Sequence, residues 1–414
     1  MTKIAICGYG IVGSGVGILC REQADTIARN RGLSLEVKYI LDVRDFPGDP
    51  YSELVTSDWQ KVFSDPEVEI VVETIGGTGV ALEYTRAAMQ HGKHVVTSNK
   101  ELVATHGAEL LQLAAENKVH YFFEAAVGGG IPLLVTLREA LAANDVLEIT
   151  GILNGTCNYI LTHLGADGRD FATILADAQD RGYAERDPAA DVDGLDTGRK
   201  LAILASMVSG EWVDPDLIHL DGIRDISVRD AQIAEILGCK LRLVARLRTR
   251  DSDENMKYEL RVAPTLLPND YPVATAKDVF NAVLIKAYPV DDIMLYGRGA
   301  GSLPTASAVL GDVIEAALNP WSTMAAQHWL PLRKDRVIPF GDCFVSALIR
   351  VKKVMEREEI IERLHDLGGI RFLDTPFADE YLIETRSEQL REGRLESGIQ
   401  QLPEGSCLQI LRKL

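Results

Sequence analysis

The feature that most constrains the fold is a short apolar strand at residues 3–7 that runs straight into Gly8-Tyr9-Gly10-Ile11-Val12-Gly13. This G-x-G-x-x-G pattern stands where a strand gives way to a helix. Gly8 allows the tight turn, Gly10 lets a pyrophosphate approach the backbone, and Gly13 lets the helix pack on the strand. The helix N-terminus would then face the phosphates. The pattern predicts a Rossmann dinucleotide-binding domain, with a glycine turn that holds no ligand as the alternative.

The end of the second predicted strand bears on the choice of cofactor. Residues 36–41 form that strand, which ends at Asp42-Val43-Arg44-Asp45. An acid here binds ribose hydroxyls and favours NAD, whereas an arginine accepts a 2′-phosphate and favours NADP. Because Asp42 and Arg44 are both present, the predicted cofactor is NADP or NAD.

Two further strand ends add candidate site residues. Residues 69–73 lead into Thr74-Ile75-Gly76-Gly77, a loop expected to pass over the cofactor. Residues 94–97 lead into Ser98-Asn99-Lys100. Ligands bind at the carboxyl ends of parallel strands, so Lys100 is a candidate site residue. An ordinary lysine at a helix start is the alternative.

Composition excludes several classes of protein. The chain has 414 residues, enough for two or three domains, and a net charge of −18 that argues against binding to nucleic acid or anionic membranes. Six scattered cysteines without a C-x-x-C pair indicate reduced thiols. No signal peptide precedes the first strand, and no apolar run reaches the length of a membrane span. We therefore expect a cytoplasmic protein.

An acidic segment at residues 181–200 is the strongest catalytic candidate. It reads RGYAERDPAADVDGLDTGRK, with a loop first and a helix from Asp196. Residues four apart on a helix share a face, so Asp196 and Lys200 should point into the same space. Carboxylates near a lysine can bind an ammonium group and tune the proton affinity of the lysine. A solvated acidic loop with one surface salt bridge is the alternative.

The rest of the chain suggests two more domains. Residues 133–143 read as a helix and residues 147–153 as a strand, while strands at 241–247, 258–266 and 282–288 predict an open, mixed or antiparallel sheet with helices on one face. Residues 294–301 read as a second glycine loop and 303–318 as a helix that returns to the first domain. After a linker at 319–336, the order is βαββαβ, a ferredoxin-like unit. The predicted domains are 1–130 with 302–330, 131–301, and 338–414.

Taken together, the motifs resemble the homoserine dehydrogenase family. The matching pieces are GYGIVG, TSNKELVA, EAAVGGGIP, GILNGTCNYILT, GYAERDPAADVDGLDTGRK and LYGRGAGSLPTASAVLGD, in the family's order over roughly residues 1 to 320. The C-terminal unit is similar, in element order, to the ACT modules of some members. It departs from them after its first strand, where VKKVMERE replaces the usual glycine-containing effector loop.

The resemblance implies an NAD(P)-dependent interconversion of L-homoserine and L-aspartate 4-semialdehyde in threonine, methionine and isoleucine biosynthesis. Lys200 would be the proton donor in aldehyde reduction, and Lys100 would stabilise the developing alkoxide between cofactor and substrate. Glu185 and Asp196 would hold polar groups of the substrate, and Asp191 would support them or Lys200.

The resemblance also implies a cofactor site, a metal site and an oligomer. The cofactor residues would be Gly8, Gly10, Ile11, Val12, Gly13, Arg44, Thr74, Ile75, Gly76, Lys100, Gly182 and Gly301. Glu124, with the carbonyls of Val127, Gly129 and Ile131, matches the family's structural sodium site, although the residues alone favour a domain hinge over a metal site. A homodimer or tetramer would form through the open sheet of the second domain, whose uncovered face we expect to be apolar.

Two other classes of function compete with this one. The first is a related Rossmann enzyme, such as an aspartate-semialdehyde or a diaminopimelate dehydrogenase. An acylating semialdehyde dehydrogenase needs a nucleophilic cysteine, and Cys157, in NGTCNY, is the only cysteine near a catalytic motif. We interpret it as a spectator. The second is a non-catalytic nucleotide sensor, which the presence of both Lys100 and Lys200 disfavours.

Overall fold

The computed structural model describes residues 1–251, 256–319, 321 and 329–414, and these group into two compact units. Unit 1 comprises Met1–Asn144, Arg199–Pro215 and Leu295–Leu332; unit 2 comprises Asp145–Gly198, Asp216–Met294 and Arg333–Leu414. Among the described residues, no helix is long and apolar enough to cross a membrane. The division into three domains stays a prediction.

Unit 1 is built on a parallel sheet, as the glycine motif predicts. Its strand order is β3-β2-β1-β4-β5-β6, and every neighbouring pair is parallel. This is the doubly wound order of Rossmann domains. The strands are β1 (Thr2–Cys7), β2 (Leu35–Leu41), β3 (Val55–Thr56), β4 (Val68–Glu73), β5 (His94–Thr97) and β6 (Tyr121–Phe122).

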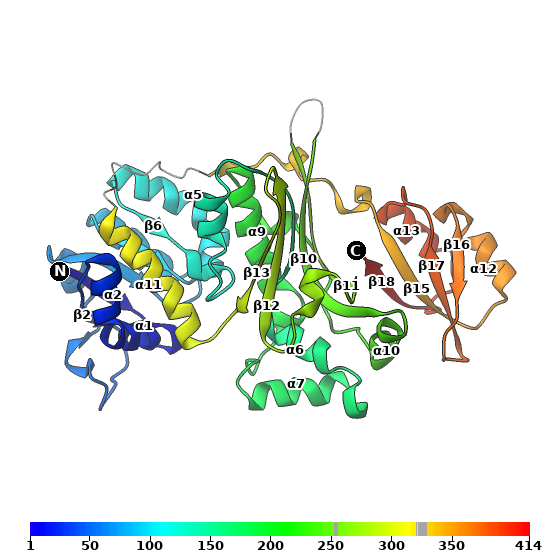
Figure 1. The fold of residues 1–414 in the computed structure, drawn as a ribbon, viewed down its shortest axis with the longest axis horizontal. Coiled ribbons are helices and arrows are strands. Elements are labelled where there is room, and N and C mark those ends of the chain that lie inside the picture. Colours follow the sequence, from blue (N-terminus) through cyan, green and yellow to red (C-terminus); the bar gives the residue numbers. More distant parts are fainter. Residues whose placement is uncertain (252–255, 320, 322–328) are drawn as a thin grey trace. The chain divides into compact units, whose positions relative to one another are not determined.

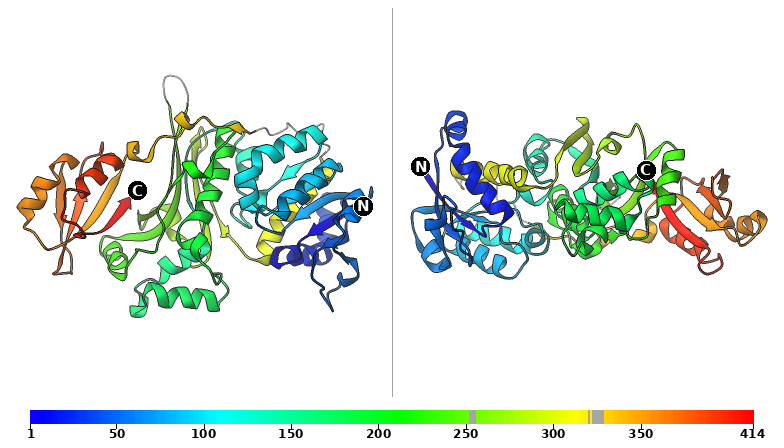
Figure 2. Two further views of the ribbon diagram at one scale, coloured as in Figure 1. Left: turned by 180° about the vertical axis from the view of Figure 1, so that it is seen from behind. Right: turned by 90° about the horizontal axis from the view of Figure 1, so that it is seen from below.

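Helices cover both faces of this sheet. On one face, Ile6, Ile70 and Val72 share a core with residues of α1 and α11, two helices that lie side by side in all views (Figure 1, Figure 2). Val71 and Val95, which alternate to the other face, are also buried. The helices of unit 1 are α1 (Ile11–Glu22), α2 (Ala24–Arg31), α3 (Trp59–Ser64), α4 (Val80–Gln90), α5 (Lys100–Asn117) and α11 (Ser302–Leu318).

Unit 2 is organised around a mixed sheet in the order β13-β12-β7-β10-β11-β18-β15-β17-β16, with β9 paired to β11. The first five of these strands are β13 (Asp291–Arg298, in this unit up to Met294), β12 (Phe280–Tyr288), β7 (Asp145–Ile152), β10 (Cys239–Arg250) and β11 (Lys257–Pro268); β9 is His219–Leu220. The helices of this part are α6 (Gly155–His163), α7 (Phe171–Asp180), α8 (Ala189–Val192) and α10 (Val228–Ile236). Helix α9 (Leu195–Ser209) begins in unit 2 and continues in unit 1.

The C-terminal residues have the predicted βαββαβ order but share a sheet with the strands before them. The elements are β15 (Ser346–Lys352), α12 (Arg357–Arg363), β16 (Ile370–Leu373), β17 (Glu380–Thr385), α13 (Glu392–Ile399) and β18 (Cys407–Lys413). Strand β18 pairs with β11 at two residue pairs, and buried Arg350 pairs with Asp230 of α10 at 2.7 Å. The two parts of unit 2 are therefore joined by the pairing of β11 with β18 (Figure 1) and by a buried ion pair.

The expectation of an apolar open face on this sheet is wrong for β10 and β11. The leucines of β10, such as Leu243 and Leu247, are buried on the same side as Val262 of β11, which the start of α9 approaches. The opposite side of β10 carries Arg246 and Arg248. Leucines and arginines alternate along β10, so one side of the strand is apolar and the other is charged. The apolar side is the one that is buried, and the sequence did not indicate which side this would be.

Three local predictions also differ from the structure. Residues 294–298 belong to β13 rather than to a glycine loop, and the helix expected at 133–143 contains a π-helical turn at Thr136–Ala140. The predicted linker contains β14 (Leu330–Pro331), paired with β8 (Glu211–Trp212). Residues 320 and 322–328 of that linker lie outside the described residues.

Candidate active site

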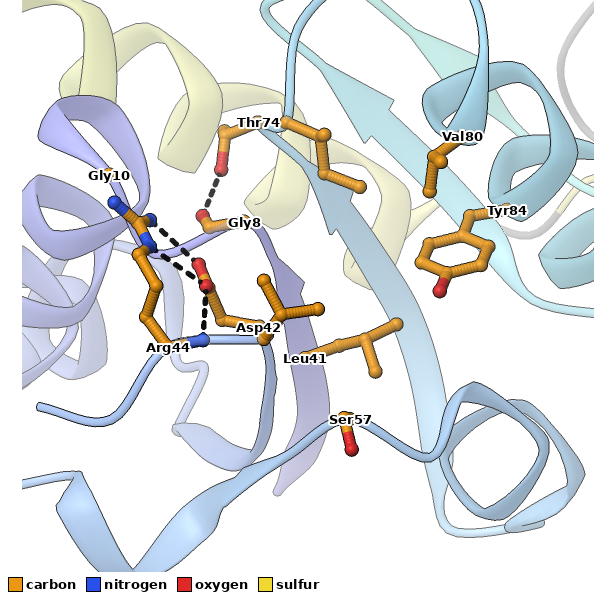
Figure 3. A pocket seen from close by; sticks show the side chains of 11 residues that line it. Gly8, Gly10, Leu41, Asp42, Arg44, Ser57, Thr74, Val80 and Tyr84 are labelled. Carbon is orange, nitrogen blue, oxygen red and sulfur yellow. Dashed lines mark hydrogen bonds and ion pairs between the residues drawn. The ribbon is translucent and has the colours of Figure 1, made fainter.

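A cavity of about 460 Å³ lies in unit 1 at the carboxyl ends of β1, β2 and β4 (Figure 3). This is the position where the strand order reverses and where doubly wound sheets bind ligands. Five predicted cofactor residues line it: Gly8, Gly10, Arg44, Thr74 and Ile75. Asp42, Val80 and Tyr84 line it as well.

The glycine loop has the geometry that its sequence predicts. Gly8 has φ +88°, a value that side chains disfavour, and its carbonyl accepts a hydrogen bond from the Thr74 hydroxyl at 2.6 Å. A Cβ atom on Gly13 would stand 2.0 Å from that same carbonyl, so α1 can approach β1 only with glycine there. A Cβ atom on Gly10 would meet no other atom within 4 Å, so this side of the residue is open. Ile11 and Val12 form the first turn of α1 and lie beside the cavity rather than lining it.

Asp42 and Arg44 act as one unit at the rim of the cavity (Figure 3). Two guanidinium nitrogens of Arg44 donate to Asp42, at 2.8 and 3.0 Å, and the Tyr9 backbone N–H donates to it at 2.7 Å. The hydrogen bonds from Arg44 lower the pKa of Asp42 to about 2, although burial opposes them. Asp42 is therefore ionised at neutral pH and already paired, while Arg44 stays largely exposed toward solvent.

A buried hydrogen-bond network connects the loop after β4 to the start of α5, which carries Lys100. Glu73 accepts the Ile75 N–H at 2.8 Å and the Thr97 hydroxyl at 2.5 Å. The Thr97 oxygen accepts the Asn99 N–H, and the Asn99 amide donates to the Gly77 carbonyl at 2.7 Å. Asn99 also caps α5. Burial raises the pKa of Glu73 against these bonds. Thr74, Ile75, Gly76 and Lys100 are thus held by one connected framework.

The acidic segment forms a second cluster, in unit 2. One amide, that of Asn154, donates to both Asp191, at 2.7 Å, and Asp196, at 2.9 Å. The oxygen of the same amide caps α6 by accepting the Cys157 N–H at 2.8 Å. Asp196 is buried, whereas Asp191 is half-buried and Glu185 is exposed. Asn154 therefore orients two of the three predicted carboxylates.

Lys200 follows Asp196 by one helical turn on α9, as the sequence predicts. The structure adds that both side chains are buried. Lysine and aspartate are rarely buried in proteins unless they are paired, so two such groups on one helix face mark a candidate functional site. Two glycines predicted to contact the cofactor have positive φ angles: Gly182 follows α7 with φ +73°, and Gly301 caps α11 with φ +119°.

The acidic segment differs from its prediction in one respect. The short helix α8 lies inside the stretch that was expected to be a loop.

The region of the predicted metal site is compact and polar. Both carboxylate oxygens of Glu124 accept backbone N–H groups, from Leu134 at 2.9 Å and from Val135 at 2.6 Å. Burial nevertheless raises the pKa of this carboxyl. An oxygen that accepts one N–H keeps a second lone pair, so the Glu124 carboxylate can still offer oxygen ligands to a cation. Among the described residues, no cluster of three or more His, Cys, Asp or Glu side chains could hold a metal.

Sequence reasoning missed the organising roles of three residues in these clusters. Asn154 was detectable because Asn before a helix start is a cap candidate, but its bond to Asp196 joins positions 42 residues apart. Glu73 was treated only as a strand end, and its partner Thr97 comes from the next strand. Asp42 was considered as a ribose ligand, whereas it holds Arg44 and Tyr9 in place.

Comparison with known proteins identifies the family to which these clusters belong. The family model described as homoserine dehydrogenase matches residues 132–314, and that described as homoserine dehydrogenase, NAD binding domain, matches residues 8–124. A homoserine dehydrogenase of Synechocystis is 38% identical over 361 residues, 83% of each chain. The crystal structure of a homoserine dehydrogenase from Thiobacillus denitrificans matches with a TM-score of 0.88 and 32% identity, over 100% of this chain and 98% of the other. A hyperthermophilic archaeal homoserine dehydrogenase in complex with NADPH matches with a TM-score of 0.64 and 27% identity, over 79% of this chain and 99% of the other.

Replacing Asn154 tests whether its amide holds the acidic cluster. Asn154→Ala removes a helix cap and leaves buried Asp196 without this donor, so we expect a loss of about 2–4 kcal/mol in the free energy of unfolding. Asp170→Ala is the matched control, because Asp170 caps α7 on the surface and should cost about 1 kcal/mol. Denaturant titration measures both. Equal losses would show that Asn154 acts only as a cap.

Proposed function

The chain belongs to the homoserine dehydrogenase family, and on that premise we propose which of its residues carry the reaction. The protein is an NAD(P)-dependent oxidoreductase that interconverts L-homoserine and L-aspartate 4-semialdehyde. When bound, the nicotinamide supplies or accepts the hydride. The chain has to bind the substrate, orient it, and move one proton at the hydroxyl oxygen. A place in threonine, methionine and isoleucine biosynthesis follows from the resemblance and is part of the proposal.

We assign the proton step to Lys200. The single observation that carries this assignment is that Asp196 and Lys200 are both buried, one turn apart on α9. A lysine in a desolvated, carboxylate-lined environment can give a proton to the alkoxide oxygen during aldehyde reduction and take it back in the reverse direction. Lys100, at the start of α5, would contribute a positive charge to the same oxygen.

The carboxylates would hold the rest of the substrate. Asp196 and Glu185 would contact the ammonium and hydroxyl groups of homoserine, and Asp191 would fix Asp196 through the shared amide of Asn154. Because Glu185 is exposed, its contact would form when substrate binds. Gly182 and Gly301, which belong to different units, stay on the proposed cofactor list by family resemblance alone.

Two substitutions at Lys200 separate proton transfer from charge. Lys200→Ala should lower kcat by roughly two orders of magnitude or more, and Lys200→Arg should fail to restore it, because arginine stays protonated. Binding of NADP should be unchanged in both variants. The same two substitutions at Lys100 provide the comparison. If Lys100 contributes through its charge, Lys100→Ala should lower kcat and Lys100→Arg should recover most of the loss. Near-normal kcat in Lys200→Ala would remove Lys200 from the mechanism.

We propose that Arg44 recognises the 2′-phosphate and that NADP is the preferred cofactor. Arg44 is the one basic side chain among the residues that line the cavity, while Asp42 is already paired with it. The archaeal relative in complex with NADPH is consistent with this preference. The guanidinium group of an arginine can bind two phosphate oxygens at once. A ribose hydroxyl offers only one oxygen and gains nothing from this geometry.

Arg44→Ala should therefore change cofactor selectivity. Loss of a charge-assisted contact should lower kcat/KM for NADP by roughly tenfold or more, with little change for NAD. Arg21→Ala, on the exposed side of α1 in the same unit, should change neither value. Steady-state kinetics with both cofactors measures the ratio, and a parallel loss for NADP and NAD would reject Arg44 as the discriminating residue.

We propose a structural sodium ion at Glu124 with the carbonyls of Val127, Gly129 and Ile131. Its support is the family resemblance and the chemistry of this buried oxygen set. Sodium chloride should raise Tm relative to choline chloride at equal ionic strength, by the mass-action stabilisation of any ligand that binds only the folded state. Glu124→Gln should abolish the difference, while Glu116→Gln, on the surface of α5, should keep it. A sodium effect that survives in Glu124→Gln would place the ion elsewhere.

We propose a homo-oligomer, dimer or tetramer, that forms at the β13 edge of the unit 2 sheet. Strand β13 is an edge strand, and Leu147, Tyr288 and Met294 expose large apolar side chains on β7, β12 and β13. Unpaired edges readily take a second strand, and a twofold partner offers the same edge in return. The C-terminal βαββαβ residues are proposed to be an ACT-like unit, with VKKVMERE at the place of the usual effector loop.

A charge at the proposed edge should weaken association. Light scattering on the intact protein should give at least twice the mass of one chain, and Met294→Lys should shift the population toward the monomer, because it introduces a charge into an apolar contact. Val354→Lys, an exposed apolar position after β15, is the control and should leave the mass unchanged. Unchanged association in Met294→Lys would exclude the β13 edge.

A further inference from the structure

A second cavity, of about 270 Å³, lies in unit 2 where the C-terminal strands join the central sheet. Its wall comes from β10 and β11 on one side and from the ends of β15, β17 and β18 on the other. Figure 1 shows β18 next to β11 at this junction. The charged side chains of the wall are Arg246, Arg248, Arg261, Arg386, Lys413 and Glu388. None of them belongs to the proposed cofactor, substrate or sodium sites.

Like charges face each other directly in this wall. Arg246 of β10 stands opposite Arg261 of β11 in the antiparallel register. Like charges at directly opposed positions destabilise a sheet. Burial, followed by the charge of Arg246, lowers the pKa of Arg261 to about 10, and the same two causes lower the pKa of Arg248. The folded chain therefore keeps an unfavourable arrangement at this place, which is expected of functional sites.

The neighbouring carboxylates do not fully neutralise these cations, because each is shared between two of them. Glu148 pairs with both Arg246, at 3.2 Å, and Arg248, at 3.0 Å. Three further carboxylates are divided in the same way: Glu259 between Arg248 and Arg250, Glu384 between Arg371 and Lys413, and Glu392 between Arg261 and Arg412. Two more carboxylates belong to this region: Asp221, which pairs with Arg412, and Glu388. Even with these two, the basic side chains named here outnumber the acidic ones. The whole chain, in contrast, has a net charge of −18.

One cation of the wall is available to a ligand. Arg386, directly after β17, is exposed, and within the described parts of the chain its guanidinium makes no ion pair or hydrogen bond to another side chain. The adjoining Ser346, Thr385 and Ser387 add hydroxyl donors to the wall. Guanidinium groups with hydroxyls beside them are the donors that bind carboxylate and phosphate oxygens.

We propose that this cavity binds a small oxyanion of a soluble metabolite, held by Arg246, Arg248 and Arg386. Its volume corresponds to roughly nine water molecules, which suits a compact carboxylate or phosphate rather than a nucleotide. The anion would contact β10 on one side of the junction and the residues after β17 on the other. The β11–β18 ladder has two residue pairs, so a bound anion would add contacts across this junction and regulate the enzyme through it.

Phosphate-dependent thermal unfolding of the intact protein tests the proposal. Wild type and variants are titrated with inorganic phosphate at constant ionic strength set by chloride, in a background of saturating NADP that fills the cofactor cavity in every sample. We expect phosphate to raise Tm in this background, and Arg386→Gln to weaken the apparent affinity by roughly tenfold or more, the cost of one charge-assisted hydrogen bond. Arg29→Gln is the matched control, because Arg29 is an exposed arginine of α2 outside the wall, and it should leave the affinity within about twofold.

A second arm identifies the class of anion. Succinate replaces phosphate at the same ionic strength. The anion that raises Tm more indicates whether the ligand is a dicarboxylate or a phosphate. Arg386 is exposed, so Arg386→Gln should fold normally and its result can be interpreted directly. The proposal is overturned if neither anion raises Tm above chloride, or if Arg386→Gln and Arg29→Gln respond alike.

Discussion

A buried carboxylate must find hydrogen-bond donors, and in this protein the amide of Asn154 supplies them for the centre of the proposed site. The same amide caps α6 and reaches Asp191 and Asp196, so one side chain fixes a helix start and two acidic groups. Asp196 in turn stands one helical turn before Lys200 on α9. The 3.6-residue repeat of a helix then sets the spacing between carboxylate and lysine, which no loop could hold as reliably.

Local rules were sufficient for the first unit. Gly8 and Gly13 were assigned from spacing alone, and the carbonyl of Gly8 shows why, since it leaves no room for a Cβ atom on Gly13. The Rossmann fold followed from this glycine motif, and the bounds of β5 were predictable because that strand is a short apolar run. The family was recognisable from its motifs, and Lys200 fell on the predicted helix.

Long-range pairing was beyond local rules. The pairing of β11 with β18 joins residues far apart in the sequence, and the sequence of neither strand indicates its pairing partner. The charged face of β10 was misjudged because alternating leucine and arginine specify two faces without saying which one the helices cover. Glu73 and Asp42 were underestimated likewise: their roles come from Thr97 and Tyr9, which other strands and loops bring to them.

The buried ion pairs of the C-terminal strands affect how the protein can be made. Asp230 is completely buried and pairs with Arg350 of β15, and Arg261 depends on Glu392 of α13. Until synthesis has passed these residues, β10, β11 and α10 exist with unpaired charges and an open strand edge, a state prone to aggregation. The central sheet of unit 2 can therefore be completed only late in translation, after Lys413 has emerged, whereas most of the parallel sheet of unit 1 is available from the first third of the chain. Chaperone dependence during expression should accordingly be concentrated in the second unit.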